Sequence, residues 1–317
     1  MSAPQSATAG FSLISRIPGV AIALAALIVG FGIMSANFLS AGNISNILVQ
    51  STILLLVALP MTLIIMTEGL DLSAGAVLTF ASIILASVSI STGSVWMGVL
   101  AGLGAGLAFG VLNGSLIALL GIPPFIVTLG TLGVAQGLSL VVTDGQSIVG
   151  IPAVIEGLYS TTALGIPLPI IISAIAYLLI HTLLYHTPFG TYIFALGGNR
   201  EALRLAGVSD RTILIAVYSL GGLMVGFAAL LMTARMNAAH PTAAIGMEFD
   251  AIAAVAVGGT SFERGDGWLL GTLLGVLAVG VLRNGLNLLA VPSSVQVACI
   301  GGLVLAALLI DGLRSRT

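Results

Sequence analysis

The chain has 317 residues, of which 58% are hydrophobic and 6% are charged, and its formal net charge is −2. An ordinary soluble domain carries roughly 25% charged residues, so this composition excludes that class. A net charge of −2 gives no indication of nucleic-acid binding, and the one cysteine, Cys299, leaves neither a disulfide framework nor a metal cluster available.

Long apolar stretches predict about ten membrane-spanning helices, since one crossing needs about 20 predominantly apolar residues. Strand-type alternation is absent, so we expect an all-α polytopic membrane protein rather than a barrel. The predicted spans lie near residues 18–36, 48–67, 72–90, 95–120, 125–143, 169–187, 213–233, 246–260, 268–290 and 293–311. We expect one transmembrane domain over residues 1–317, with a tail at 1–17 and a polar loop at 188–212.

Two carboxylates interrupt the apolar sequence between the second and third predicted spans. Glu68 and Asp71 are costly beside a membrane core unless they are solvated or paired. Asp71 precedes Ser73 at the start of a span, which is typical of a helix N-cap region. The alternative is a gate or a contact with a partner protein.

Two asparagines lie inside predicted spans, Asn113 in the fourth and Asn284 in the ninth. Such amides can join neighbouring helices by hydrogen bonds. They could equally line a path for a hydroxyl-rich solute, because a path that must release its solute needs neutral donors and acceptors. We treat both as candidate pore residues.

The loop after the sixth span concentrates the polarity of the chain. Five charged residues occur between positions 197 and 211. Asn199 can cap a short helix, Glu201 then lies in its first turn, and Arg204 follows at a spacing that allows pairing with Glu201. The loop predicts a docking helix for a partner, and the alternative is a solvated loop whose arginines set topology. The candidate docking residues are Gly197, Gly198, Asn199, Arg200, Glu201, Ala202, Arg204 and Gly207.

The eighth span is short and begins with Glu248 and Asp250. A broken or re-entrant helix is tolerated where its backbone is buried in protein. The two carboxylates are candidates for an outer gate, or they cap this short helix. We find no catalytic constellation, metal site or cofactor site in the sequence.

The nine arginines predict the orientation, since the chain has no lysine. If the N-terminus is cytoplasmic, seven of the nine fall on the cytoplasmic side, in agreement with the positive-inside bias. Both termini and the 188–212 loop are then cytoplasmic.

A weak internal repeat relates the two halves of the chain. The segment from Gly110 resembles the one from Gly280, and the segment from Gly69 resembles the one from Gly246. These offsets of about 171 and 177 residues pair spans two to five with spans seven to ten. Five intervening crossings would make the halves inverted repeats, which is a frequent plan among transporters.

Four motifs in order carry a resemblance to a known family. They are Glu68-Gly69-Leu70-Asp71-Leu72-Ser73-Ala74-Gly75, the Gly121–Gly130 segment GIPPFIVTLG, Ala195–Ala202 (ALGGNREA) and Gly258-Gly259-Thr260-Ser261-Phe262. The chain resembles the ribose/xylose/galactose-type sugar permeases of ATP-binding-cassette (ABC) importers, a branch that also contains branched-chain amino acid permeases.

The resemblance implies cytoplasmic ABC ATPase subunits docked on the loop around Glu201, a periplasmic sugar-binding protein and a second permease copy in a homodimer or heterodimer. It implies the bacterial inner membrane as the location. The chain has no Walker A motif, so ATP hydrolysis would reside in a partner chain. The alternatives are a branched-chain amino acid permease and an ion-coupled secondary transporter, for which intramembrane ionisable residues are usual.

Overall fold

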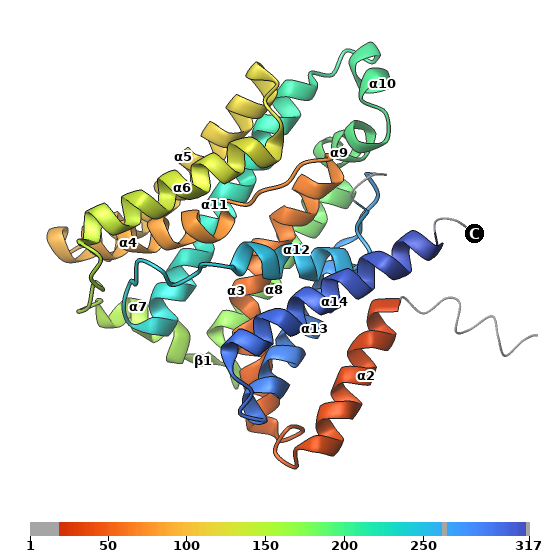
Figure 1. Cartoon of the computed structure of the whole chain (residues 1–317). Helices are drawn as coiled ribbons and strands as arrows, with labels where there is room; N and C mark the ends of the chain where they lie inside the picture. The colour runs from red at the N-terminus through yellow and green to blue at the C-terminus, as the bar shows by residue number, and fades with distance from the viewer. Residues whose placement is uncertain (1–18, 262–264, 315–317) are drawn as a thin grey trace, which may run out of the picture.

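The computed structural model describes residues 19–261 and 265–314, and its regular structure is almost entirely helical. The helices are α2 (Gly19–Met34), α3 (Ala41–Met66), α4 (Ala74–Thr92), α5 (Val95–Leu120), α6 (Pro124–Thr143), α7 (Ala153–Ser160), α8 (Leu168–His186), α9 (Pro188–Gly198), α10 (Arg200–Leu205), α11 (Asp210–Met236), α12 (Met247–Val257), α13 (Leu269–Leu288) and α14 (Ser293–Arg314). A short antiparallel hairpin, β1 (Thr162–Ala163) with β2 (Ile166–Pro167), leads into α8. Figure 1 shows the arrangement of these elements.

Within residues 19–261 and 265–314, seven helices are long and apolar enough to cross a bilayer, namely α3, α4, α5, α6, α8, α11 and α13. The predicted all-α polytopic membrane protein is therefore confirmed. The other three predicted spans coincide with α2, α12 and α14. Helix α12 has 11 residues and is as short as the sequence indicates. The number of ten crossings stays a prediction.

Helices α3 and α11 form the buried centre of the molecule. From Ser51 to Met66 every residue of α3 is buried, which fits a helix that is apolar on all sides and surrounded by other helices. Helices α5, α6 and α8 instead leave large apolar side chains exposed, such as Leu100, Leu129 and Leu178. Apolar side chains on the outside of a helical bundle are what contact with lipid requires.

Glycines at every fourth position of α5 allow its backbone to approach α11 closely. A Cβ atom on Gly106 would collide with the carbonyl oxygen of Gly222, and one on Gly110 would collide with that of Tyr218. Small residues at this spacing are typical of packed membrane helices. This contact joins the first half of the chain to the second.

The packing of α4 on α5 recurs in the packing of α12 on α13. In each pair, two glycines of the longer helix lie against backbone carbonyls of the shorter one. The contacts are those of Gly98 with Leu85, Gly102 with Ala81, Gly271 with Gly258 and Gly275 with Ala254. Corresponding residues are 173 residues apart, between the two offsets that the sequence motifs indicate.

Helices α4 and α12 begin beside each other inside the protein. The segments that precede them, residues 67–73 and 237–246, lack regular helix or strand over most of their length. Gly75, in the first turn of α4, lies against the carboxylate of Glu248, in the first turn of α12, and a Cβ atom on Gly75 would collide with it. The two irregular segments thus place the N-terminal ends of α4 and α12 next to each other in the interior of the protein.

Candidate functional site

The predicted docking loop is a pair of short helices at one end of the molecule (Figure 1). Helix α8 ends at His186, and the separate helix α9 that follows it ends with Gly197 and Gly198. Asn199 ends α9 and begins α10, and its Oδ1 accepts a hydrogen bond from the Ala202 N–H at 2.9 Å. The predicted cap is confirmed.

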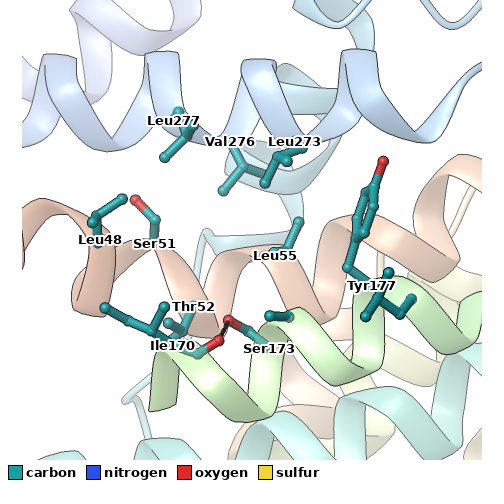
Figure 2. A pocket seen from close by; sticks show the side chains of 12 residues that line it. Leu48, Ser51, Thr52, Leu55, Ile170, Ser173, Tyr177, Leu273, Val276 and Leu277 are labelled. Carbon is teal, nitrogen blue, oxygen red and sulfur yellow. Dashed lines mark hydrogen bonds between the residues drawn. The ribbon is translucent and has the colours of Figure 1, made fainter. Parts of the chain in front are cut away.

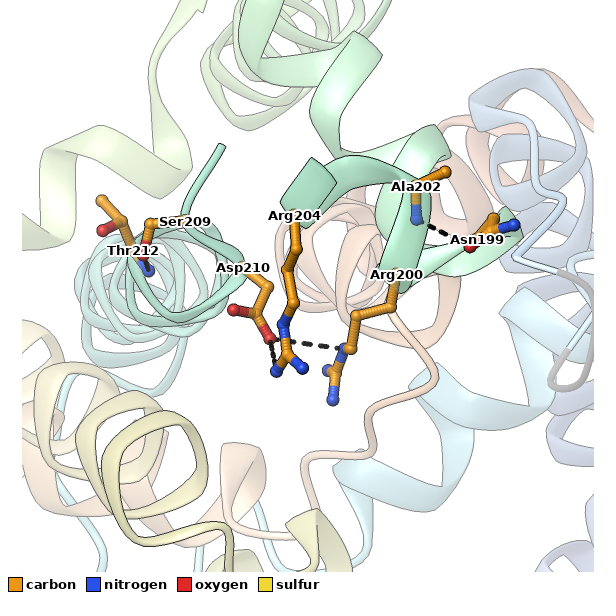
Figure 3. A network of polar contacts seen from close by, with 7 residues as sticks. All are labelled: Asn199, Arg200, Ala202, Arg204, Ser209, Asp210 and Thr212. Atoms are coloured by element: carbon orange, nitrogen blue, oxygen red, sulfur yellow. Dashed lines mark hydrogen bonds and ion pairs between the residues drawn. The ribbon is translucent and has the colours of Figure 1, made fainter. Parts of the chain in front are cut away.

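An ion pair fixes α10 to the start of α11 (Figure 3). The Arg204 guanidinium donates to Asp210 Oδ2 at 2.6 Å, and the Arg200 Nε atom lies 3.7 Å from the same oxygen. The expected pairing of Arg204 with Glu201 is wrong. The Asp210 side chain is only 9% exposed, so solvent screens its attraction less than it would screen that of an exposed glutamate. The hydrogen bond from Arg204 to Asp210 raises the pKa of Arg204 above its ordinary value.

The outer face of α10 is small and partly apolar. Leu203 is buried and anchors the helix, whereas Leu205 is 85% exposed. Ala202 and Ala206 are exposed on the same short helix. A shallow depression of about 440 Å³ lies beside it, lined by Arg204 and residues 207–211. This surface has the features of a helix that docks on another protein, with apolar side chains flanked by charges.

The Glu68–Ser73 segment is held from several helices. Glu68 is exposed, but Asp71 is buried, and its Oδ1 accepts hydrogen bonds from the N–H (2.8 Å) and hydroxyl (2.6 Å) of Ser73. The carbonyl oxygen of Leu70 accepts from the hydroxyls of Tyr218 at 3.2 Å and Thr128 at 3.3 Å. Ser73 occupies the N-cap position of α4 without a capping bond from its own side chain. The Asp71 side chain therefore stabilises the turn before α4, and hydroxyl groups of α6 and α11 fix the turn in place.

The docking segment contacts the end of α3, just before the Glu68–Ser73 segment. Gly197, near the end of α9, lies against the carbonyl oxygen of Met66 and against Gly265. Met66 is the last residue of α3 and stands two residues before Glu68. The structure thus brings together two sets of candidate residues that are about 130 positions apart in the sequence.

The two candidate pore asparagines are buried and bonded to other side chains. Asn113 donates to the Ser73 hydroxyl at 3.0 Å, while its Oδ1 finds no partner within the described residues. Asn284 and Asn43 exchange two hydrogen bonds of 2.9 Å each, and Asn43 also donates to the Phe38 carbonyl at 2.8 Å. In this conformation both amides join helices.

Glu248 and Asp250 face different partners. Glu248 Oε1 accepts from the Gly246 N–H at 3.2 Å, and its buried Oε2 has no hydrogen-bond partner within residues 19–261 and 265–314. Asp250 Oδ2 accepts from Arg283 on α13 at 2.5 Å. Arg283 is not among the predicted site residues, although it is the one charged residue within the ninth predicted span and an intramembrane charge is a usable signal.

An apolar pocket is separate from all these residues (Figure 2). It measures about 400 Å³ and lies between α3, α8 and α13. Four residues in its wall carry a hydroxyl. Those of Ser51, Thr52 and Ser173 each donate to a carbonyl of their own helix, and the fourth belongs to Tyr177. Leucine, isoleucine and valine side chains form most of the rest of the wall. It presents few groups for a polar solute.

Comparisons with known proteins give full-length matches. Residues 43–308 match the family described as branched-chain amino acid transport system / permease component. The chain is 40% identical to a ribose import permease protein of Bacillus subtilis (strain 168), over 94% of this chain and 93% of that protein. It is 34% identical to the D-allose transport system permease protein of Escherichia coli (strain K12), over 94% and 92% of the two chains.

A third relative is the L-arabinose ABC transporter permease protein of Azospirillum brasilense, which is 33% identical over 98% of this chain and 92% of its own length. No solved structure matches the chain.

Proposed function

This chain belongs to the family of the branched-chain amino acid transport system / permease component, and from this premise we propose that it is the membrane-spanning subunit of an ABC importer for a monosaccharide. The observation that carries the substrate class is the near full-length similarity to permeases for ribose, D-allose and L-arabinose. These relatives favour a sugar over a branched-chain amino acid. An ion-coupled mechanism has less support, since buried carboxylates are few in the long spans.

Cytoplasmic ATPase subunits dock on α10 and drive the transport cycle. The residues that contact them are those of the segment from Gly197 to Gly207, with Glu201 central. The exposed Leu205 and the exposed alanines beside it support this role, since a docking helix needs apolar side chains that are free to enter a groove. ATP binding closes the two ATPases, moves α10 and shifts the permease between inward- and outward-facing states. Glu68, Asp71 and Ser73 form the adjoining contact or gate.

A periplasmic sugar-binding protein delivers the solute, and a second permease copy completes the path. The single transmembrane domain of residues 1–317 lies in the bacterial inner membrane with both termini cytoplasmic. Residues 1–17 are a cytoplasmic tail, outside the described residues, and 188–212 are the coupling loop. The arginine distribution supports this orientation. Glu248 and Asp250 lie near the outer gate, and Asn113 and Asn284 are pore residues if their helices separate during transport.

The permease has ten spans built from two inverted repeats. Helices α3 to α6 correspond to α11 to α14, in the same order. The glycine contacts that recur after 173 residues support this correspondence at the level of single backbone atoms. The contacts between elements agree, because α4 contacts α5, α6 and α11, while α12 contacts α13, α14 and α3. The Gly75–Glu248 contact relates two positions that are themselves 173 residues apart, as a local two-fold axis requires.

A charge reversal in α10 tests the proposal. We expect the tagged chain, expressed with its own ATPase and purified in mild detergent, to retain the ATPase, and we expect Glu201→Lys to lose it through like-charge and steric conflict at the interface. Glu156→Lys in α7 is the matched control, since Glu156 is exposed and lies outside the docking segment. Normal retention of the ATPase by Glu201→Lys would refute the docking site. Solute exchange in liposomes without ATP would instead favour a secondary transporter.

A further inference from the structure

Arg283 is a half-exposed charge within a spanning helix. It lies in α13, between the buried residues Leu282 and Asn284, and its side chain is 44% exposed. Its guanidinium donates to Asp250 Oδ2 at 2.5 Å, and the Asp250 side chain is 10% exposed. The ion pair thus consists of a buried carboxylate on α12 and a partly exposed arginine at the surface of this chain.

Lipid is an unfavourable environment for this surface. A charged side chain within the hydrocarbon region is costly, and such residues almost always face the bundle interior or a water-filled cavity. An arginine near a helix end can avoid the cost by extending to the headgroups. The guanidinium of Arg283 is instead bound to Asp250, in the first turn of α12. The exposed edge of the guanidinium therefore needs water or polar groups beside it.

A second polar residue continues the same face. Asn287 follows Arg283 by four residues, so the two lie one above the other on α13. Asn287 is exposed, and its Oδ1 accepts from Gln296 Nε2 on α14 at 2.7 Å. Exposed side chains of other spans, such as Leu178 and Leu179 on α8, are large and apolar. Helix α13 exposes Leu270 and Leu288 as well, so the polar surface that distinguishes it from α8 is confined to Arg283 and Asn287.

We propose that Arg283 and Asn287 line the path of the solute, and that the Arg283–Asp250 pair offers hydrogen bonds to the hydroxyl groups of a monosaccharide. This inference rests on the proposed transport function. A guanidinium has five N–H donors, and the bond to Asp250 leaves others free. The buried carboxylate holds the guanidinium in place and offsets its charge. A neutral solute then meets fixed donors without a strong anion-binding site.

Single-cysteine labelling tests the placement without any transport measurement. Cys299 is the one cysteine of the chain, so Cys299→Ser gives a cysteine-free background. We place a cysteine at Asn287, which leaves the ion pair intact, and a control cysteine at Leu178. A charged methanethiosulfonate reagent is added to the assembled complex in nanodiscs. The reagent reacts with the thiolate, and the thiolate forms only where water reaches the thiol. We therefore expect Asn287→Cys to react at least about tenfold faster than Leu178→Cys.

Arg283 itself is tested by Arg283→Cys combined with Asp250→Asn, which leaves no unpaired buried carboxylate. We expect this variant to react as fast as Asn287→Cys. Equal and slow reaction of all three cysteines in the assembled complex would overturn the placement. Reaction in the isolated chain but not in the complex would also overturn it, because the face would then be covered by a second copy. Neither result bears on the docking of the ATPase, which Glu201→Lys tests separately.

Transport tests the proposed role in the path. With the native ATPase and binding protein in proteoliposomes, we expect Arg283→Gln combined with Asp250→Asn, which leaves no unpaired buried carboxylate, to lower the rate of solute uptake at least about tenfold, as the loss of one charged hydrogen bond predicts. Retention of the ATPase on purification should be unchanged. Uptake at the wild-type rate would overturn the assignment of the guanidinium to the solute path.

Discussion

Replacing both members of the Asn43–Asn284 pair should destabilise the protein by less than the sum of the two single replacements. Asn284→Leu removes two buried hydrogen bonds. It leaves the Oδ1 atom of Asn43 without a donor and the Nδ2 group of Asn43 without one of its two acceptors. At about 0.6–2 kcal/mol for each bond between membrane helices, the loss of two bonds is about 1–4 kcal/mol. Asn43→Leu also removes the donor to the Phe38 carbonyl and should cost about 1 kcal/mol more.

The double variant leaves no unpaired amide, so the two single effects should not add. We expect a coupling free energy of about 1–2 kcal/mol in the double-mutant cycle. The free energy of unfolding can be measured by titrating the purified chain with SDS in mixed micelles, with the fluorescence of Trp96 and Trp268 as the signal. Asn46→Leu is the matched control, since Asn46 lies on the same helix and is exposed. Additive single effects, or single effects as small as that of Asn46→Leu, would refute the reasoning.

Two further predictions concern the α5–α11 contact and the cap of α10. Gly106→Val should destabilise the chain by about 1–3 kcal/mol or prevent its folding, because a valine side chain has no space beside Gly222. Gly104→Val, on the open side of α5, should be tolerated. Equal thermal stability of the two variants would contradict this prediction. Asn199→Ala should lower the amount of ATPase that co-purifies, since α10 loses its N-cap. Asn199→Asp, which keeps a capping oxygen, should retain the wild-type amount. Unchanged recovery of the ATPase with alanine would show that the cap is dispensable.

The sequence predicts those parts of the structure that depend on local chemistry. Composition and the length of the apolar stretches are sufficient for the all-α membrane fold, since the bilayer leaves few alternatives. The cap at Asn199 follows from its position before Arg200 and Glu201. The glycines at 102, 106 and 110 also form a local pattern that predicts close packing, but the sequence does not say which helix they meet.

The sequence does not specify which side chains pair between different helices. The expected Arg204–Glu201 pair is local, whereas the observed Arg204–Asp210 pair depends on how the chain turns between α10 and α11. Asn284 finds its partner 241 residues away. Such contacts are decided by the tertiary packing of helices, which periodicity and spacing do not specify. The roles of Glu68, Glu248 and Asp250 stay predictions for the same reason.

The contacts around α9 explain how a force on α10 would reach the membrane domain. Gly197 lies directly against the Met66 carbonyl, with no side chain between the two backbones, and Gly190 lies against Leu184 at the end of α8 in the same way. Backbone contacts of this kind leave little free space to absorb a displacement, because packed interiors have low compressibility. A movement of α9 would therefore shift the end of α3.

The segment after α3 passes that movement on. The Leu70 carbonyl is held by hydroxyls from α6 and α11, and Ser73 by the amide of Asn113 on α5. Residues 67–73 thus connect the docking end to three long helices at once. Because α4 begins at Ala74 and meets α12 at the Gly75–Glu248 contact, a displacement that enters at α10 has a continuous route of packed groups to Asp250 and Arg283. A continuous series of packed groups thus joins the proposed coupling loop to the proposed solute path.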